Sequence, residues 1–432
     1  MILGWLSRAF DRAPHAGRPF ASSDANSAVV RLRFGDRRRG QPERQRQPHT
    51  ADGVDRPVVI VFGVQPPPIN GMSVVNAVIA EQVADRSCRV VIADISPRDT
   101  SGIRYHARRV GRVLMALARI AGPVEPQRTL YAAVDSGWGI LYTIAAVAVG
   151  RICGSRLILH YHTADYVRRR RRLCTTLVWF AGAEAHHVLA SASMTKQFGI
   201  NYPRARLFLP VHNTAFVPAD PPKSRHGKRP LTLGLLSNLT RAKGLDAAIN
   251  TAVALAERNC PCRLILGGPV LDPAADAAIA RGRDVLGDRL ELRGPISGTA
   301  KEKFFADIDV FLFATTYRHE TQSLVVPEAM SHAVPVIAYA HGFVAELLDD
   351  GGGVLVDPSA DFADEAIPTL ETWSAYPRLL DEAGRIARER FVALRRHAEG
   401  QLTELLRLCA ADTRTPEFGD NRADIADAAG KR

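Results

Sequence analysis

The sequence predicts an α/β fold class with two Rossmann-like domains that face each other across a cleft. From residue 57 onward, short apolar runs alternate with longer segments that have helical spacing, a pattern typical of strands buried on both faces of a parallel sheet. The alternation stops once, in the proline-rich polar segment 217–230, and then restarts. Ligands bind beyond the carboxyl ends of the strands in such sheets, so we expect both domains to line the cleft.

The composition sets the number of domains. The chain has 432 residues, of which 46% are hydrophobic, and this length and composition suit two or three packed domains. Ten arginines in residues 1–55 predict a basic, disordered leader. After it we expect a first domain at 56–216, a linker at 217–230, a second domain at 231–371, C-terminal helices that pack back across the domain junction at 372–410, and a disordered tail at 411–432.

Twelve apolar runs are the expected strands. In the first domain they are 58–62, 90–93, 130–133, 157–159, 188–190 and 207–209. In the second domain they are 231–236, 264–267, 290–292, 310–313, 336–338 and 354–356. Each is followed by a segment long enough for the crossover helix that a parallel connection requires.

The charge and the cysteines restrict the class of protein. A net charge of +11 is compatible with nucleic acid, phosphate or anionic lipid as a partner. Aromatic residues make up only 7% of the chain, which argues against nucleic acid because base stacking needs aromatic side chains. The six cysteines form no C-x-x-C pair, and no apolar stretch has the roughly 20 residues of a spanning helix. We therefore expect a cytoplasmic protein.

Several common signatures are missing. The sequence contains no G-x-G-x-x-G after the first strand, no G-x-x-x-x-G-K-[ST] and no G-x-S-x-G. A dinucleotide-dependent dehydrogenase, a P-loop nucleoside triphosphatase and an α/β-hydrolase are therefore disfavoured.

The segment 319–337 is the most informative one. An expected strand leads into a loop with Glu320, and a helix with Glu328 follows. The two carboxylates would lie roughly 12 Å apart, at 1.5 Å of rise per residue. That span fits a sugar, a diphosphate and a ribose, and the backbone N–H groups near Ser323 and Leu324 would form a helix N-terminus that can hold phosphate. Taken alone, such a pair is better explained as two unrelated solvated glutamates on an ordinary α/β helix.

This segment is similar to the E-x7-E motif of family 4 retaining glycosyltransferases (glycosyl transferases group 1), which have the two-domain GT-B fold. The resemblance covers residues 57–358, and further motifs occur in the order of the family. They are residues 65–73 (QPPPINGMS), 160–163 (HYHT), 236–244 (LSNLTRAKG), 267–269 (GGP), 293–296 (RGPI) and 352–358 (GGVLVDP).

The resemblance implies a role for each matching residue. Glu328 would bind the ribose hydroxyls of a nucleotide-sugar donor, and Glu320 would hold the transferred sugar near its anomeric carbon. Lys243 would neutralise the departing diphosphate, and His162 would contact the sugar or donate a hydrogen bond to the leaving group. The other donor-binding residues that the resemblance implies are Gly71, Asn238, Arg293, Pro295, Ser323 and Leu324. The resemblance also implies that no metal or other cofactor is required.

Four positions depart from the family pattern. Asn238 stands where the family often has arginine, Thr321 and Ser323 stand where it often has glycine, and Ala333 replaces a glycine before the strand at 336–338. These changes concern the donor sugar and the reaction rate more than the fold.

The pair Asp307 and Asp309 resembles a metal-binding Asp-x-Asp. It precedes the strand at 310–313 instead of following one, so we expect two solvated carboxylates at a helix end and no metal ion.

Two arginine-rich features suggest an anionic membrane surface as a partner. In the helix that runs from Ile103 to Ile120, four arginines lie within an 80° arc and the apolar side chains lie opposite. A second cluster consists of five consecutive arginines, from Arg168 to Arg172. The alternatives are an ordinary surface helix packed on the first domain and a solvated charge run.

The combined prediction is a retaining glycosyltransferase that moves a sugar from a nucleoside-diphosphate donor to an acceptor hydroxyl. The expected acceptor is a glycan or a lipid-linked glycan of bacterial cell-envelope or exopolysaccharide synthesis, at the inner face of the membrane. Two alternatives stay open at this point: a nucleotide-sugar epimerase of related fold, and a non-catalytic GT-B-like binding protein.

Overall fold

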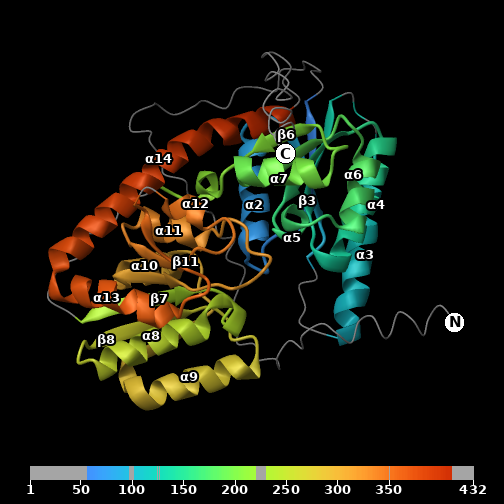
Figure 1. Cartoon of the computed structure of the whole chain (residues 1–432). Coiled ribbons are helices and arrows are strands. Elements are labelled where there is room, and N and C mark those ends of the chain that lie inside the picture. The colour runs from blue at the N-terminus through green and yellow to red at the C-terminus, as the bar shows by residue number, and fades with distance from the viewer. Residues whose placement is uncertain are drawn as a thin grey trace, which may run out of the picture.

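The computed structural model describes residues 56–96, 102–123, 125, 127–219, 230–349 and 351–410, with only the backbone described at 102–104. The expected leader at 1–55, most of the linker and the tail at 411–432 lie outside the described residues. Within them the chain forms two α/β domains, joined by a long C-terminal helix (Figure 1).

The first domain is built on a six-stranded sheet in the order β2-β1-β3-β4-β5-β6, in which every described pairing is parallel. Its strands are β1 (Val58–Gly63), β2 (Arg89–Asp94), β3 (Arg128–Val134), β4 (Arg156–Tyr161), β5 (His186–Leu189) and β6 (Leu207–Pro210). Its helices are α2 (Gly71–Ala84), α3 (Gly102–Ile120), α4 (Ile140–Ile152), α5 (Asp165–Arg168), α6 (Arg172–Ala181) and α7 (Ala192–Asn201), with short 3-10 turns η1 (Gly137–Gly139) and η2 (Asn213–Phe216).

The second domain repeats this architecture with the strand order β12-β11-β10-β7-β8-β9, again parallel throughout. Its strands are β7 (Leu231–Leu236), β8 (Cys262–Gly267), β9 (Leu290–Gly294), β10 (Val310–Phe313), β11 (Val336–Tyr339) and β12 (Gly353–Val356). Its helices are α8 (Leu245–Glu257), α9 (Pro273–Leu286), α10 (Thr299–Asp307), α11 (Val325–Ser331), α12 (Ala345–Leu348) and α13 (Phe362–Ala375), with 3-10 turns η3 (Arg241–Lys243) and η4 (Gly287–Arg289).

The predicted α/β fold class with two Rossmann-like sheets is confirmed. Each of the twelve apolar runs overlaps one strand, because a strand buried on both faces is a continuous apolar sequence. The run at 188–190 is displaced, since β5 begins at His186 and ends at Leu189. His187 is fully buried in this strand and its Nδ1 atom lies 3.0 Å from the Tyr161 hydroxyl, so a polar residue occupies a core position.

Two helices account for the C-terminal region expected at 372–410. The chain breaks at Tyr376 and Pro377, so that α13 ends at Ala375 and α14 covers Pro377–Cys409. Proline suits the first turn of a helix because the N–H that it lacks would have no intrahelical partner there. The first part of α14 packs on α11 of the second domain, and its last part packs on η2, α2 and β3 of the first (Figure 1).

The core of the first domain is divided by its sheet. Side chains of α3, α4, α6 and α7 pack on one face, whereas α2 and the end of α14 pack on the other, where Leu402, Leu405 and Cys409 join the apolar side chains of β1. Within the described residues, no helix combines the length and the apolar character that crossing a bilayer requires.

Candidate active site

The predicted site residues come from loops at the carboxyl ends of the strands. The loop 64–70 follows β1, His162 follows β4, Lys243 ends the short turn after β7, and Glu320 lies in the loop after β10. Both sheets are parallel, so these loops gather at the edge of each sheet where ligands of such folds bind.

The loop after β1 meets the segment between Glu320 and Glu328. Asn70 and Ser73 form a reciprocal capping box that fixes the start of α2. A Cβ atom on Gly71 would lie 3.8 Å from Leu324 Cδ1, an ordinary van der Waals contact. Gly71 and Leu324, which belong to different domains, therefore face each other.

His162 lies directly after β4 and provides an unsatisfied polar group. Its Nε2 atom is buried and has no hydrogen-bond partner among the described residues, and its ring lies 4.2 Å from that of His160. Burial lowers the pKa of His162 to about 4. The imidazole is thus neutral near pH 7, with one N–H donor and one acceptor nitrogen.

Lys243 and Glu320 form an ion pair on the second-domain side. Lys243 Nζ lies 2.5 Å from Glu320 Oε2, and the ammonium also lies 4.5 Å from the centre of the Tyr317 ring, within cation–π range. Glu320 is 8% exposed. The pair places a cation and a carboxylate together at the carboxyl edge of the second sheet.

Glu328 lies in α11 and is 8% exposed. Its Oε1 atom lies 2.6 Å from Lys301 Nζ of α10, whereas Oε2 is buried without a partner among the described residues. Ser331 donates a hydrogen bond to the Glu328 carbonyl, which holds the backbone of this turn. One carboxylate oxygen is therefore engaged and the other is available to a ligand hydroxyl.

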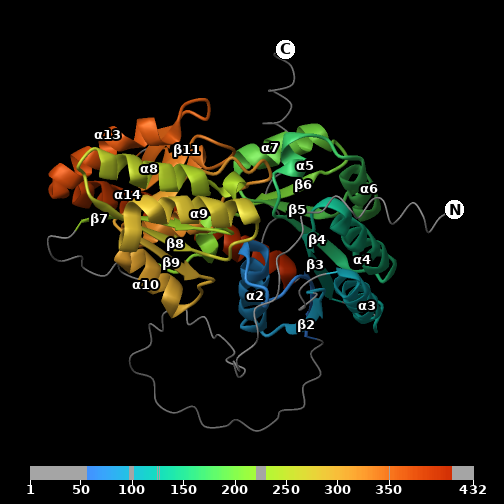
Figure 2. The same ribbon diagram turned by 90° about the horizontal axis from the view of Figure 1, so that it is seen from below.

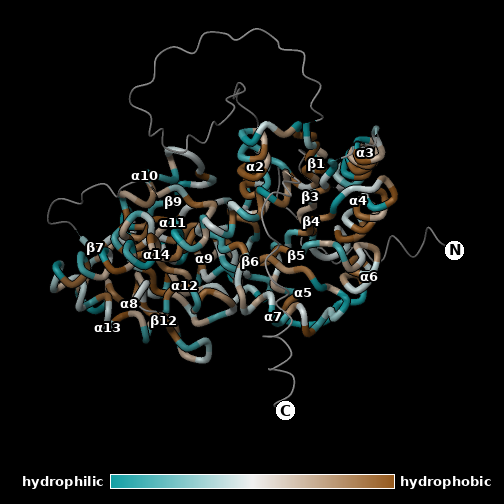
Figure 3. Tube along the Cα trace, turned by 90° about the horizontal axis from the view of Figure 1, so that it is seen from above, coloured by the Kyte–Doolittle hydropathy of each residue, from teal (hydrophilic) through white to brown (hydrophobic). Residues whose placement is uncertain are grey.

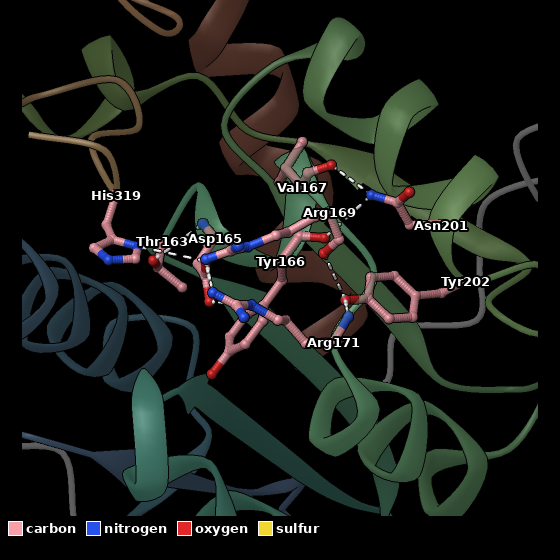
Figure 4. A network of polar contacts seen from close by, with 9 residues as sticks. All are labelled: Thr163, Asp165, Tyr166, Val167, Arg169, Arg171, Asn201, Tyr202 and His319. Atoms are coloured by element: carbon pink, nitrogen blue, oxygen red, sulfur yellow. Dashed lines mark hydrogen bonds and ion pairs between the residues drawn. The ribbon is translucent and has the colours of Figure 1, made fainter.

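A polar network fixes the Glu320 loop to the first domain (Figure 4). Arg171 donates two hydrogen bonds to Asp165, of 2.5 and 2.7 Å, and His319 Nδ1 lies 3.6 Å from the same carboxylate. The backbone N–H of Ala164 donates to the carbonyl of His319 at 3.1 Å. The residue before Glu320 is thus bonded to the loop that follows His162, so the two candidate catalytic residues come from loops in direct contact.

The sequence of the second domain resembles a known family. Residues 230–372 match the family model described as glycosyl transferases group 1. This match supports a glycosyltransferase activity. The comparison with curated proteins finds no match.

Solved structures share the two-domain GT-B fold of this glycosyltransferase at low sequence identity. HepE of Anabaena, crystallised with UDP and glucose, is 16% identical with a TM-score of 0.58, over 81% of this chain and 99% of that one. Sucrose-phosphate synthase of Thermosynechococcus elongatus is 17% identical with a TM-score of 0.61, over 82% and 100%. A glycosyltransferase of Rickettsia africae is 11% identical with a TM-score of 0.60, over 83% and 100%. At these identities the likeness shows the fold.

The positions of the other predicted donor-binding residues in the second domain say less about their roles. Ser323 and Leu324 immediately precede α11, and Asn238 is exposed after β7. The guanidinium of Arg293 bonds Glu291 at 2.7 Å and Asp307 at 2.8 Å. The side chain of Arg293 is therefore engaged within the domain, and the segment that includes Pro295 can offer a ligand its backbone.

The expectation for the Asp307 and Asp309 pair needs correction. Asp307 pairs with Arg293, and Asp309 is only 7% exposed and accepts a hydrogen bond from the backbone N–H of Thr232. Asp309 is thus a buried acceptor that joins two strands instead of a solvated residue at a helix end. Among the described residues, no three histidine, cysteine or acidic side chains gather as a metal site would require.

Several arginines of the two arginine-rich features make contacts within the protein. Arg112 pairs with Asp94 at 2.8 Å and Arg119 donates to the carbonyl of Ile92, so these side chains of α3 face the sheet. Arg104 lies outside the described side chains. In the cluster from Arg168 to Arg172, Arg171 bonds Asp165, and Arg168 lies 3.4 Å from His341 of the second domain.

Sequence analysis missed four residues of the site, and only one of them had a signal in the sequence. Lys301, Tyr317 and Asp165 contact predicted residues but belong to no motif that the sequence analysis used. Gln322 lies inside the E-x7-E segment, is 1% exposed, and accepts a hydrogen bond from Asn213 of the first domain. Its position between the two glutamates was the one available clue.

Proposed function

We propose that this glycosyltransferase belongs to family 4 and transfers a sugar with retention at the anomeric carbon. The donor is a nucleoside-diphosphate sugar and the acceptor is a hydroxyl of a glycan or a lipid-linked glycan in cell-envelope or exopolysaccharide synthesis. The reaction requires no metal ion, and the enzyme works in the cytoplasm, at the inner face of the membrane.

One observation carries this proposal. The loops with His162 and Glu320 are bonded to each other across the two domains, and each side provides polar groups suited to part of a nucleotide sugar. Among the described residues, Nε2 of His162 in the first domain and Oε2 of Glu328 in the second are buried and have no hydrogen-bond partner. Buried polar atoms are normally hydrogen-bonded, so these atoms suit a ligand with hydroxyl groups.

Each residue has a chemical role in the proposed transfer. The bond between the anomeric carbon and the diphosphate breaks, a bond to the acceptor oxygen forms, and negative charge grows on the diphosphate. Lys243 stabilises that charge electrostatically. Glu328 accepts hydrogen bonds from the ribose, and Glu320 holds the sugar. The neutral imidazole of His162 donates a hydrogen bond without adding a positive charge.

The donor base is the first property to test. HepE was crystallised with UDP and glucose, and this makes UDP-glucose the first donor to try. UDP, GDP, ADP and dTDP should be compared by thermal shift, because a ligand that binds only the folded state raises its stability. We expect one of them to raise the melting temperature clearly more than the others. Equal, negligible shifts with all four would contradict a nucleotide-sugar donor.

Two substitutions test the roles of the glutamates. Glu328→Ala should raise the KM for the donor about tenfold or more, because it removes the ribose acceptor, while Glu320→Gln should mainly lower kcat. Exposed Glu302→Gln, on α10, is the matched control. Wild-type kinetics in both site variants would disprove these roles. Incubation with donor alone separates the alternatives, since an epimerase forms a new nucleotide sugar and a transferase yields at most slow hydrolysis.

A further inference from the structure

The outer surface of the first domain exposes an unusual set of apolar side chains. Helices α3, α4 and α6 lie side by side on one face of its sheet, away from the second domain (Figures 1 and 2). Their outward side chains, together with Trp138 of η1, include seven large apolar ones that are 43–85% exposed. These seven form the outer apolar face: Val110, Leu114, Met115, Trp138, Leu141, Ile152 and Trp179.

Helix α4 makes this face exceptional. Its sequence, ILYTIAAVAVGRI, contains one charged residue, Arg151, at its penultimate position, and Figure 3 colours most of the helix as hydrophobic. A helix that is apolar all round is normally buried on all sides. Here one side stays open, with Leu141 43% and Ile152 85% exposed, so this side fits a partner that accepts apolar side chains.

The charge of the three helices restricts that partner. The sequences of α3, α4 and α6 contain no aspartate or glutamate. Of their arginines, Arg109 and Arg112 pair with Asp135 and Asp94 inside the domain, so the charge that matters for a partner is that of the exposed arginines near Trp179. A hollow of about 560 Å³ beside Trp179 is lined by three arginines, Arg151, Arg204 and Arg206. Exposed arginines next to exposed apolar and tryptophan side chains match a bilayer surface, where phosphates lie beside the acyl region.

A second copy of the chain fits this face less well. In a two-fold dimer the same patch lies on both sides of the interface. The exposed arginines at the hollow, Arg151, Arg204 and Arg206, would then face those of the other copy, and none of the three helices supplies an acidic partner. An anionic lipid surface, in contrast, neutralises these arginines.

We propose that the outer apolar face docks this enzyme on an anionic membrane, with lipid phosphates in the hollow formed by Arg151, Arg204 and Arg206. This inference rests on the proposed function, because it explains how a lipid-linked acceptor reaches the cleft. Trp138 and Leu141 follow the carboxyl end of β3, which pairs with β4 next to His162. A membrane bound here thus lies beside the acceptor side of the site. The surface includes apolar side chains of the helix expected at 103–120, but it does not include the cluster from Arg168 to Arg172.

Vesicle flotation of the full chain tests the proposal. We expect binding to vesicles of phosphatidylcholine and phosphatidylglycerol in a 7:3 ratio, little binding to pure phosphatidylcholine, and loss of binding at high salt. Leu114→Glu combined with Met115→Glu should lower the bound fraction at least fivefold, and Arg204→Glu combined with Arg206→Glu should act similarly. Val285→Glu on α9, where the wild-type side chain is 47% exposed, is the matched control and should bind like wild type.

Three outcomes would overturn the proposal. They are no flotation of the wild type, wild-type flotation of both double variants, and a wild-type dimer that Leu114→Glu with Met115→Glu converts to a monomer. Trp179→Ser serves as an additional variant if a double variant fails to fold, and it should also lower the bound fraction. The thermal shift with nucleotides is measured on the same samples, so a failure of membrane docking is distinguished from a failure of donor binding.

Discussion

Lys301 forms an ion pair with Glu328, the residue expected to bind the donor ribose. Its ammonium lies 2.6 Å from Oε1 of Glu328, and Oε2 has no partner among the described residues. Removing one partner of a buried ion pair leaves an uncompensated charge. We therefore expect Lys301→Met to raise the KM for the donor about fivefold or more, with a smaller change in kcat, in steady-state assays.

The control for this residue lies on the same helix. Lys303 of α10 is exposed, and Lys303→Met removes the same charge without touching Glu328. It should leave the KM within about twofold of wild type. If both variants raise the KM equally, the effect comes from the net charge of α10 and not from the contact with Glu328.

At the scale of elements, the loop after β4 positions the loop after β10. Asp165 receives both hydrogen bonds of Arg171 and the contact with His319, next to Glu320. An asparagine side chain at this position would have one acceptor oxygen and no charge. Asp165→Asn should lower kcat about tenfold, which is about 1.4 kcal/mol of transition-state stabilisation, and change nucleotide affinity little, because Lys243 and Glu328 stay in place.

This split between kcat and affinity identifies Asp165 as a positioning residue. A general loss of stability would reduce nucleotide affinity and turnover together. Asp288→Asn, at an exposed position of η4, should leave both unchanged. A wild-type kcat for Asp165→Asn would show that the network of Figure 4 does not align the Glu320 loop.

The last part of α14 packs on the first domain and so links the two domains. Leu405 is fully buried against the first sheet, and a leucine-to-alanine change at such a site costs about 2–5 kcal/mol. Leu405→Ala should lower the free energy of unfolding by that amount in a urea titration. Val392→Ala, at a position that is 37% exposed on the same helix, should cost less than about 1 kcal/mol.

The sequence predicts strands better than helix orientation in this molecule. A strand buried on both faces is a continuous apolar run, so β1 and β7 are evident from sequence alone. For α3, the angular spacing of the residues around the helix shows which of them share a side. It does not show which side meets the sheet. Arg112 reaches Asp94 at the end of β2, and Leu114 is consequently 61% exposed. Lys301 was missed for a related reason, since its partner Glu328 lies 27 residues away.

At the scale of the whole molecule, buried histidines are concentrated in the first domain. Burial lowers the pKa of five of them below the ordinary value of about 6.5. For His186 and His212 the pKa is about 4, as it is for His162. For His187 it is about 3, and for His160 it lies well below the ordinary range.

This distribution makes the molecule sensitive to acid. Between about pH 6.5 and pH 4 the unfolded chain binds protons that the folded chain does not, so stability rises with pH in this window and is lost as the pH falls. At pH 5, a histidine with a pKa as low as that of His187 destabilises the fold by about 2 kcal/mol relative to neutral pH. The melting temperature should therefore fall by several degrees between pH 7 and pH 5.

His187→Phe tests this origin of the acid sensitivity. A phenyl ring suits the site, because His187 is enclosed by the rings of Tyr161, Phe198 and Phe208, although the Tyr161 hydroxyl loses its partner. We expect lower stability than wild type at pH 7, but a smaller fall of the melting temperature between pH 7 and pH 5. His397→Gln, on the exposed side of α14, should keep the wild-type slope. The unfolded His187→Phe chain lacks the imidazole that binds a proton at this position. If the melting temperature of this variant fell between pH 7 and pH 5 as much as that of the wild type, the acid sensitivity would arise elsewhere.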